Sequence, residues 1–274
     1  MDPLFIFYLL VLGAVVGFAA GLLGIGGGML MVPFLTMLFT WKKLPPDLIV
    51  HVAIATSMTS ILFTSVSSVW AHQRKGAVIW KIVAMMAPGI ILGGLLSGGA
   101  VFAALNTAWL SLAFALFVGY SGMKMLRKSA PNPVRTMPGL VGTSAAGAGI
   151  GFISGLVGAG GGFLSVPFMA RSNVPLHNAV ATSAALGFPI ALANSVGYIF
   201  SGMNETSSVP GMLGYIYLPA LGALVVVSVL TAPLGARFAH QLPVATLKRI
   251  FAFLLFGLAA YMAYKAFSAF TVGV

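Results

Sequence analysis

The sequence contains no cysteine and only three acidic residues, Asp2, Asp47 and Glu205, among 274. Without cysteine the chain has no disulfide, no thiolate nucleophile and no cysteine-ligated metal. Charged residues make up 6% of the chain, against roughly 25% in a soluble domain, and 59% are hydrophobic. Such a chain cannot cover its surface for water, so the composition predicts a membrane protein.

The motifs of ATPases and intramembrane enzymes are also missing. There is no GxxxxGK[ST] phosphate-binding loop, no HExxH pair and no pair of neighbouring acids. The three carboxylates fall in segments predicted to be external, so none is placed at mid-membrane to carry a proton or bind Na⁺ in the usual way. We therefore expect no enzymatic activity, no cofactor and no metal site.

Continuous apolar runs dominate what is present, and their lack of alternation excludes an outer-membrane barrel. Five runs precede a polar basic linker and five follow it, each time in the order long, short, long, long, long. The fold predicted is an all-α polytopic membrane protein, with four long transmembrane helices and one short half-helix in each half. The runs are 4–24, 28–40, 48–70, 82–104 and 107–126, then 139–159, 162–171, 176–200, 214–236 and 249–268.

Two motifs occur once in each half. The run "GLLGIGGGMLMVPFL" at 21–35 matches "GLVGAGGGFLSVPFM" at 155–169, and "HVAIATS" at 51–57 matches "HNAVATS" at 177–183. Ordered matches with drifting offsets indicate an internal duplication. We expect an N-terminal repeat at 1–126, a basic cytoplasmic linker at 127–138 and a C-terminal repeat at 139–274.

The net charge of +11 follows the positive-inside pattern rather than indicating nucleic-acid binding. If each short run returns the chain to the side it came from, 11 of the 14 basic residues share one side; if it continues the preceding helix, the split is 8 against 6. The first assignment makes the two repeats inverted relative to each other. It places both termini on the outer side of the inner (plasma) membrane. The 11 are Arg74, Lys75, Lys81, Lys124, Arg127, Lys128, Arg135, Arg171, Arg237, Lys248 and Arg249; Lys42, Lys43 and Lys265 lie opposite.

The glycine runs predict short helices that begin within the membrane. Their backbone N–H groups and helix dipoles would create partial positive charge there, and glycine lets a ligand approach closely. Two such ends converging from opposite faces would form an anion site. The alternative is that the glycines only allow tight helix packing. The candidate residues are Gly26, Gly27, Gly28, Gly160, Gly161 and Gly162.

Hydroxyl and amide side chains follow in the helices after each short run. Thr56, Ser57, Thr182, Ser183 and Asn194 are candidates for hydrogen bonds to an anion, although such residues also pack or bond to their own helix. Two histidines, His51 and His177, start these helices in equivalent places. Each is either structural or a gating, proton-linked group.

The twin GxxGxGGG…VPF motifs, each followed by an ATS helix, resemble the sulfite exporter family of the TauE/SafE type over essentially the whole chain. The resemblance implies an inner-membrane transporter of small sulfur-containing anions, and it assigns the substrate region to both glycine motifs and to Thr56, Ser57, Thr182 and Ser183.

We therefore expect a secondary transporter that exports sulfite, an organosulfonate or a sulfoacetate-type anion from a site at the midplane. An anion channel, a carrier of another small organic anion and a subunit of a larger assembly are the alternatives. The expected partners are the substrate and the lipid bilayer, with no nucleic acid, and a homo-oligomer stays open.

Overall fold

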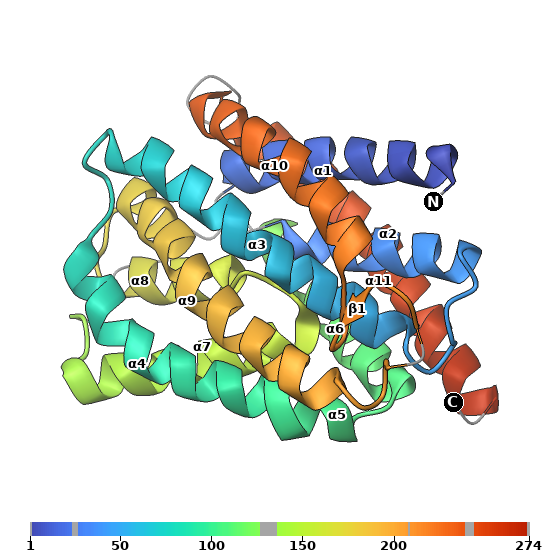
Figure 1. The fold of residues 1–274 in the computed structure, drawn as a ribbon. Helices are drawn as coiled ribbons and strands as arrows, with labels where there is room; N and C mark the ends of the chain where they lie inside the picture. Colours follow the sequence, from blue (N-terminus) through green and yellow to red (C-terminus); the bar gives the residue numbers. More distant parts are fainter. Residues whose placement is uncertain (1, 24–26, 127–135, 208, 239–243, 273–274) are drawn as a thin grey trace.

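A computed structural model describes the chain except for residues 1, 24–26, 127–135, 208, 239–243 and 273–274. In this part of the chain, eight helices are long and apolar enough to cross a membrane (Figure 1). The first half contains α1 Pro3–Leu23, α2 Gly28–Trp41, α3 Ile49–Gln73, α4 Trp80–Leu96, the π-helical turn η1 Ser97–Val101, α5 Phe102–Ala104 and α6 Thr107–Leu126. The second half contains α7 Leu140–Val157, α8 Gly162–Arg171, α9 Leu176–Gly202, β1 Met212–Leu213, β2 Ile216–Tyr217, α10 Leu218–Phe238 and α11 Val244–Val272.

These elements confirm the all-α polytopic fold, with one short helix after the first long helix of each half. The segments α4, η1 and α5 together make one span, Trp80–Ala104. The hairpin β1–β2 was not expected, since the sequence predicts a helix from residue 214. The backbone turns instead at Gly211 and Gly214, both at positive φ, and α10 begins only at Leu218 with Pro219 in its first turn.

Glycines let helices of opposite halves touch backbone to backbone. In the α1–α10 pair, a Cβ added at Gly17 would lie 2.6 Å from the Cα of Ser228. In the α7–α4 pair, a Cβ at Gly147 would lie 2.5 Å from the carbonyl oxygen of Met86. The first helix of each half therefore packs closely on the fourth helix of the other half, as small residues permit in membranes.

Contacts along the helices also establish their directions. In α3 and α9, Thr59 meets Ser195, and the later Ser65 meets the earlier Gly187, so these helices run antiparallel. By the same comparison α3 runs parallel to α10, and α4 runs parallel to α9. Equivalent helices of the two halves thus point in opposite directions, which supports the inverted repeat. The division into repeats 1–126 and 139–274 stays a prediction.

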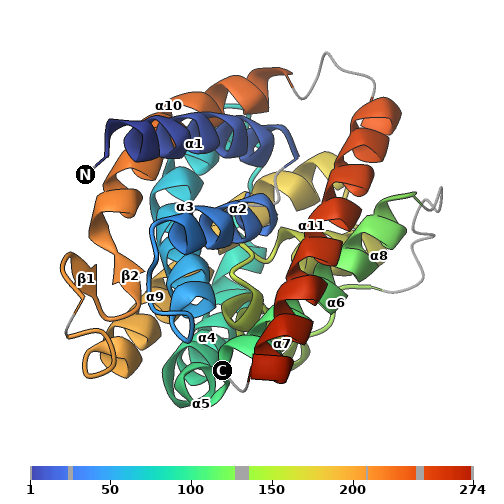
Figure 2. The ribbon, with the colours of Figure 1, turned by 90° about the vertical axis from the view of Figure 1, so that its right-hand side faces the viewer.

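The helix directions place the charges at two ends of the molecule. Figure 2 looks toward the end where α1 begins and α11 finishes, with α2 and α3 between the outer helices. This acidic end carries Asp2, Asp47, Glu205 and the lysines Lys42, Lys43 and Lys265. The opposite, basic end carries Arg74, Lys75, Lys81, Lys124, Arg171, Arg237 and Arg249. The positive-inside rule predicts that the basic end faces the cytoplasm.

Candidate functional site

Both short helices begin at the glycine motifs. Their N-caps, Gly27 and Gly161, have left-handed backbones with φ of 69° and 75°, and no side chain caps either helix. Amides of the second turn bond to the N-cap carbonyls, as in Ser165 N–H to Gly161 O at 2.8 Å. The amides of the first two residues of each helix come before these bonds, so each helix start directs N–H groups and partial positive charge toward the space in front of the N-cap.

The contacts of α2 place its start inside the membrane. Its last residue, Trp41, lies 6.3 Å from the Phe5 ring at the start of α1, and Gly27 lies against Val16 and Ala20 toward the other end. With 14 residues, α2 is about 21 Å long, short of about 30 Å of hydrocarbon. The predicted half-helix therefore starts part-way across the thickness that α1 spans.

The two glycine motifs meet in the interior. A Cβ added at Gly28 would collide with the carbonyl oxygen of Gly158, and Gly158 in turn lies against Ile54 in α3. Gly161 lies against Ile150 and Ser154 of α7, at positions equivalent to Val16 and Ala20. The second motif thus packs between Ile54 of α3 and Ile190 of α9, and the first motif packs on α1 and α3. The predicted candidate Gly26 lies outside the described residues.

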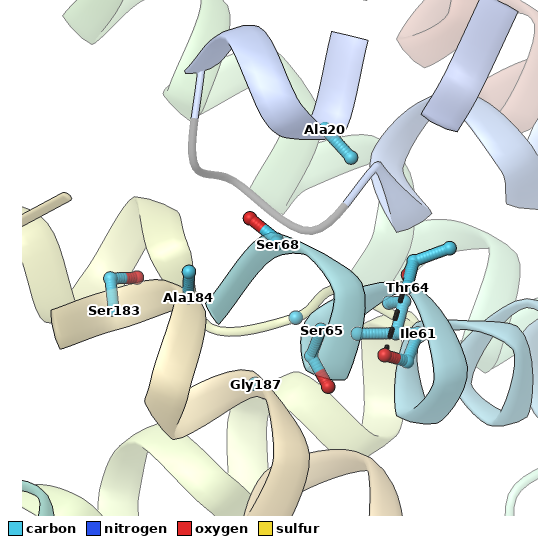
Figure 3. Close-up of a pocket in the computed structure, with 9 residues that line it drawn as sticks. Ala20, Ile61, Thr64, Ser65, Ser68, Ser183, Ala184 and Gly187 are labelled. Carbon is cyan, nitrogen blue, oxygen red and sulfur yellow. Dashed lines mark hydrogen bonds between the residues drawn. The ribbon is translucent and has the colours of Figure 1, made fainter. Parts of the chain in front are cut away.

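Beside the second motif, a buried cavity of about 20 Å³ lies between α1, α3, α9 and the residue before the α8 N-cap. Figure 3 shows Thr64, Ser65 and Ser68 coming from α3, and Ser183 and Gly187 coming from α9. This volume holds about one water molecule. The lining residues are Ala20, Ile61, Thr64, Ser65, Ser68, Gly160, Ser183, Ala184 and Gly187.

Four hydroxyl side chains line the cavity among apolar groups, and no charged side chain is among its lining residues. The Ser65 hydroxyl donates to Leu62 O at 3.0 Å, and Ser183 receives the Ser165 hydroxyl at 2.8 Å. Among the described residues, the Ser68 hydroxyl has no hydrogen-bond partner, although Ser68 is only 6% exposed. A buried hydroxyl without a partner costs free energy, so this donor is available to a ligand.

Two predicted residues instead join the halves. The Thr56 hydroxyl accepts the backbone N–H of Tyr217 at 3.0 Å, and the Thr182 hydroxyl accepts that of Ile79 at 3.0 Å. Tyr217 and Ile79 immediately precede α10 and α4, the third long helices of the two halves. Each ATS threonine therefore satisfies an amide at the helix start of the opposite half, outside the cavity lining.

The ATS serines have different partners. Ser183 lines the cavity, whereas Ser57 is fully buried and finds no hydrogen-bond partner in the described part of the chain. The difference follows from the short helices, because Ser165 of α8 is replaced by Met31 at the equivalent position of α2. The sulfur of Met31 receives the hydroxyl of Ser60 at 3.0 Å.

Asn194 joins three helices rather than lining the cavity. Its Oδ1 accepts the Ser97 hydroxyl at 2.8 Å, and its amide donates to Ile190 O at 2.8 Å and to Gly151 O at 3.4 Å. The side chain thereby satisfies groups of η1, α9 and α7 at once, which is a structural role in an apolar interior.

The two histidines occupy unlike surroundings. His51 is buried at the acidic end, with Nε2 2.8 Å from Leu105 O and Nδ1 3.2 Å from Asp47 O. Its ring stacks on Tyr215 at 5.1 Å, and burial, with Glu205 and Asp47 nearby, raises the pKa of this tyrosine. His177 is exposed at the basic end. The structure therefore brings only His51 into a packed contact between the halves.

Sequence reasoning noted the hydroxyls of α3 without selecting those that line the cavity. Thr64, Ser65 and Ser68 share a helix face with Ile61, and their spacing of three and four residues is the signal that identifies them. Among the described residues, no group of three or more histidines or acids is placed to hold a metal ion.

Comparison with known proteins gives one family and several relatives. The family model described as "Sulfite exporter TauE/SafE" matches residues 9–262. A probable membrane transporter protein of Haemophilus influenzae is 34% identical over 95% of this chain and 99% of its own length. Similar proteins are found in Methanocaldococcus jannaschii, at 27% identity over 85% of this chain and 86% of the relative, and in Bacillus subtilis, at 31% over 71% and 78%. No solved structure matches.

Proposed function

Because the chain belongs to the sulfite exporter TauE/SafE family, a family of membrane transporters rather than enzymes, we propose that it is a secondary transporter. Its cargo is a small sulfur-containing oxyanion, such as sulfite, an organosulfonate or sulfoacetate, and transport runs outward across the inner membrane. The basic end faces the cytoplasm, and both termini face outside.

The observation that carries this proposal is the unpartnered Ser68 hydroxyl in the cavity at the start of α8. Gly160 lines the same cavity directly before the Gly161 N-cap, where the helix dipole favours negative charge. Sulfite and sulfonate groups present several acceptor oxygens and no donors. Hydroxyl groups and backbone amides are suited to such a group because they donate hydrogen bonds.

Neutral donors favour an anion of low charge. The desolvation penalty of an ion rises steeply with its charge, and the cavity has no lysine or arginine to offset a second negative charge. Among the proposed cargoes, a monoanion such as methanesulfonate is therefore preferred over a dianion such as sulfoacetate.

The driving force requires no carboxylate in the membrane. A negative interior potential favours outward movement of an anion by about 2.3 kcal/mol per charge per 100 mV. The three acids all lie at the acidic end, so efflux down the potential fits the residues that are present.

Entry of the substrate requires movement, since a cavity of about 20 Å³ is too small for a sulfonate. Ser65 and Ser68 lie in the half of α3 nearer the basic end, and Ser183 lies near the start of α9. At the acidic end, the rings of His51, Phe102 and Tyr215 pack together. We infer an occluded state whose cavity opens toward the basic end.

The test is efflux of sulfite, methanesulfonate and sulfoacetate from proteoliposomes at a set membrane potential. We expect saturable efflux that accelerates when the interior is negative and slows when the potential is reversed. Flux that ignores the sign of the potential would contradict net anion movement. Ohmic single-channel currents would indicate a channel instead of a carrier.

A further inference from the structure

A second, larger cleft lies at the basic end, between the end of α3 and the end of α10. Its volume is about 140 Å³, against about 20 Å³ for the buried cavity. The lining residues are Trp70, Ala71, His72, Arg74, Lys75, Pro233 and Arg237.

The charge of this cleft is positive and uncompensated by acids. Arg74, Lys75 and Arg237 are exposed around it. All three carboxylates of the chain belong to segments of the acidic end, a helix length away. The Arg74 guanidinium lies 3.5 Å from the centre of the Trp70 ring, and this contact holds it at the cleft. An anion is therefore the ligand that this cleft attracts.

The cleft continues the polar face that lines the buried cavity. Thr64, Ser68 and His72 follow one another at four-residue spacing on α3, and all three are buried. Ser68 lines the cavity, and His72 lines the cleft one helical turn further on, about 6 Å along the axis. The two spaces are thus neighbours on one side of α3.

We propose that the cleft is the cytoplasmic vestibule of the transporter, in which Arg74, Lys75 and Arg237 collect the small oxyanion before it passes Ser68. This inference rests on the proposed function. The cations raise the local concentration of the anion. Because they are exposed and screened by salt, they hold the anion only weakly, so it can pass on to the hydroxyls of the cavity.

A lipid phosphate has the same oxyanion chemistry and is the other source of a ligand for these cations. The transported anion is favoured because the polar face of α3 leads from the cleft to the cavity, where no lipid tail fits. The two sources differ in their dependence on lipid composition, which the experiment uses.

The test uses three variants of the cleft: Arg237→Gln, Lys75→Gln and the double variant that combines them. The controls are Lys81→Gln and Arg171→Gln, which change two exposed cations of the same end that do not line the cleft. Sulfite and methanesulfonate uptake is measured in inside-out membrane vesicles, whose basic ends face the medium. We expect the double variant to raise the apparent KM about 5- to 10-fold at low salt with an unchanged maximal rate. The effect should shrink at high salt, because exposed charges are screened.

Several outcomes overturn the vestibule. One is an equal change of KM in the two control variants, and another is no change in the double variant while the wild type transports. A third is a defect that appears in proteoliposomes containing anionic lipid and is absent in purely zwitterionic ones, which assigns the cleft to the headgroup of an anionic lipid. If the wild type carries no sulfur oxyanion at all, the proposed function fails and the vestibule fails with it.

Discussion

The neighbouring residues Ser68 and Ser67 differ in whether their hydroxyls have a hydrogen-bond partner. Buried polar groups almost always find partners, but the hydroxyl of Ser68, a residue only 6% exposed, has none within the part of the chain that the structure describes. Its neighbour Ser67 instead donates to Val229 O at 2.9 Å. We therefore expect Ser68 to bind the ligand and the adjacent Ser67 to stabilise the fold.

Ser68→Ala should weaken substrate binding without loss of stability. We expect the apparent substrate affinity to fall about 5- to 10-fold, the loss of one hydrogen bond of about 1 kcal/mol or slightly more. The midpoint of thermal unfolding should stay level or rise, because the substitution removes an unsatisfied buried group.

Efflux kinetics and thermal unfolding of the purified protein measure both effects. Ser67→Ala is the control, with a lower unfolding temperature and an unchanged affinity. Equal affinities for Ser68→Ala and the wild type would remove this hydroxyl from the site.

Sequence reasoning reaches some residues of the cavity and misses others for a physical reason. Ser183 and Gly160 were found because they belong to repeated motifs. Thr64, Ser65 and Ser68 have no counterparts in α9, where Ile190, Ala191 and Asn194 stand at the equivalent positions. Repetition cannot identify a site that only one half supplies.

At the scale of elements, the ATS threonines connect the halves. Thr56 and Thr182 accept amides at the starts of α10 and α4, so the third long helix of each half is joined to the second long helix of the other. The sequence shows that the motif is repeated, but it does not show the partner, because the partner is a backbone amide more than 100 residues away.

Thr56→Val and Thr182→Val should each lower the free energy of unfolding by about 1–3 kcal/mol, since a buried amide loses its acceptor. Thermal unfolding in detergent measures the loss. Thr→Ser at each position should recover most of the stability, because it keeps the hydroxyl. If valine and serine variants unfold at the same temperature, packing rather than the hydrogen bond explains the motif.

The glycine N-caps were predictable as helix starts, and their backbone geometry explains why. Gly27 and Gly161 have left-handed backbones, a conformation that costs an L-residue roughly 1–2 kcal/mol. The composition around them predicted short helices, and both helices begin within one residue of that prediction.

Gly161→Ala should therefore lower the unfolding temperature and transport together, because the side chain also meets Ile190. Gly149→Ala, in the middle of α7 with open space around its Cα, is the matched control and should be neutral or slightly stabilising. Thermal unfolding and efflux of the two variants give the comparison. A Gly161→Ala protein as stable and active as the control would show that the left-handed N-cap is not required.

At the scale of the whole molecule, charge and helix direction agree. The count of basic residues predicted the topology from the sequence, and the contacts of α3, α4, α9 and α10 give the same relative directions. The hairpin β1–β2 was unpredictable because its turns depend on two glycines within an otherwise apolar segment.

The inverted topology predicts that Lys42 and Arg171, which follow the equivalent short helices α2 and α8, lie on opposite sides of the membrane. Because the native chain has no cysteine, Lys42→Cys and Arg171→Cys each carry a unique thiol. An impermeant thiol reagent should label Lys42→Cys in intact spheroplasts and Arg171→Cys only after the membrane is disrupted. Labelling of both from one side would rule out inverted repeats.

The contact between Gly28 and Gly158 has a consequence for leakage. No side chain separates the two backbones, and closely packed interiors transmit displacement rather than absorb it. We therefore expect a shift of one motif to displace the other, so that the proposed transport path does not open to both sides of the membrane at once. We expect the protein to leak neither protons nor water during the transport cycle. The membrane potential, which is the proposed driving force for efflux, is then preserved.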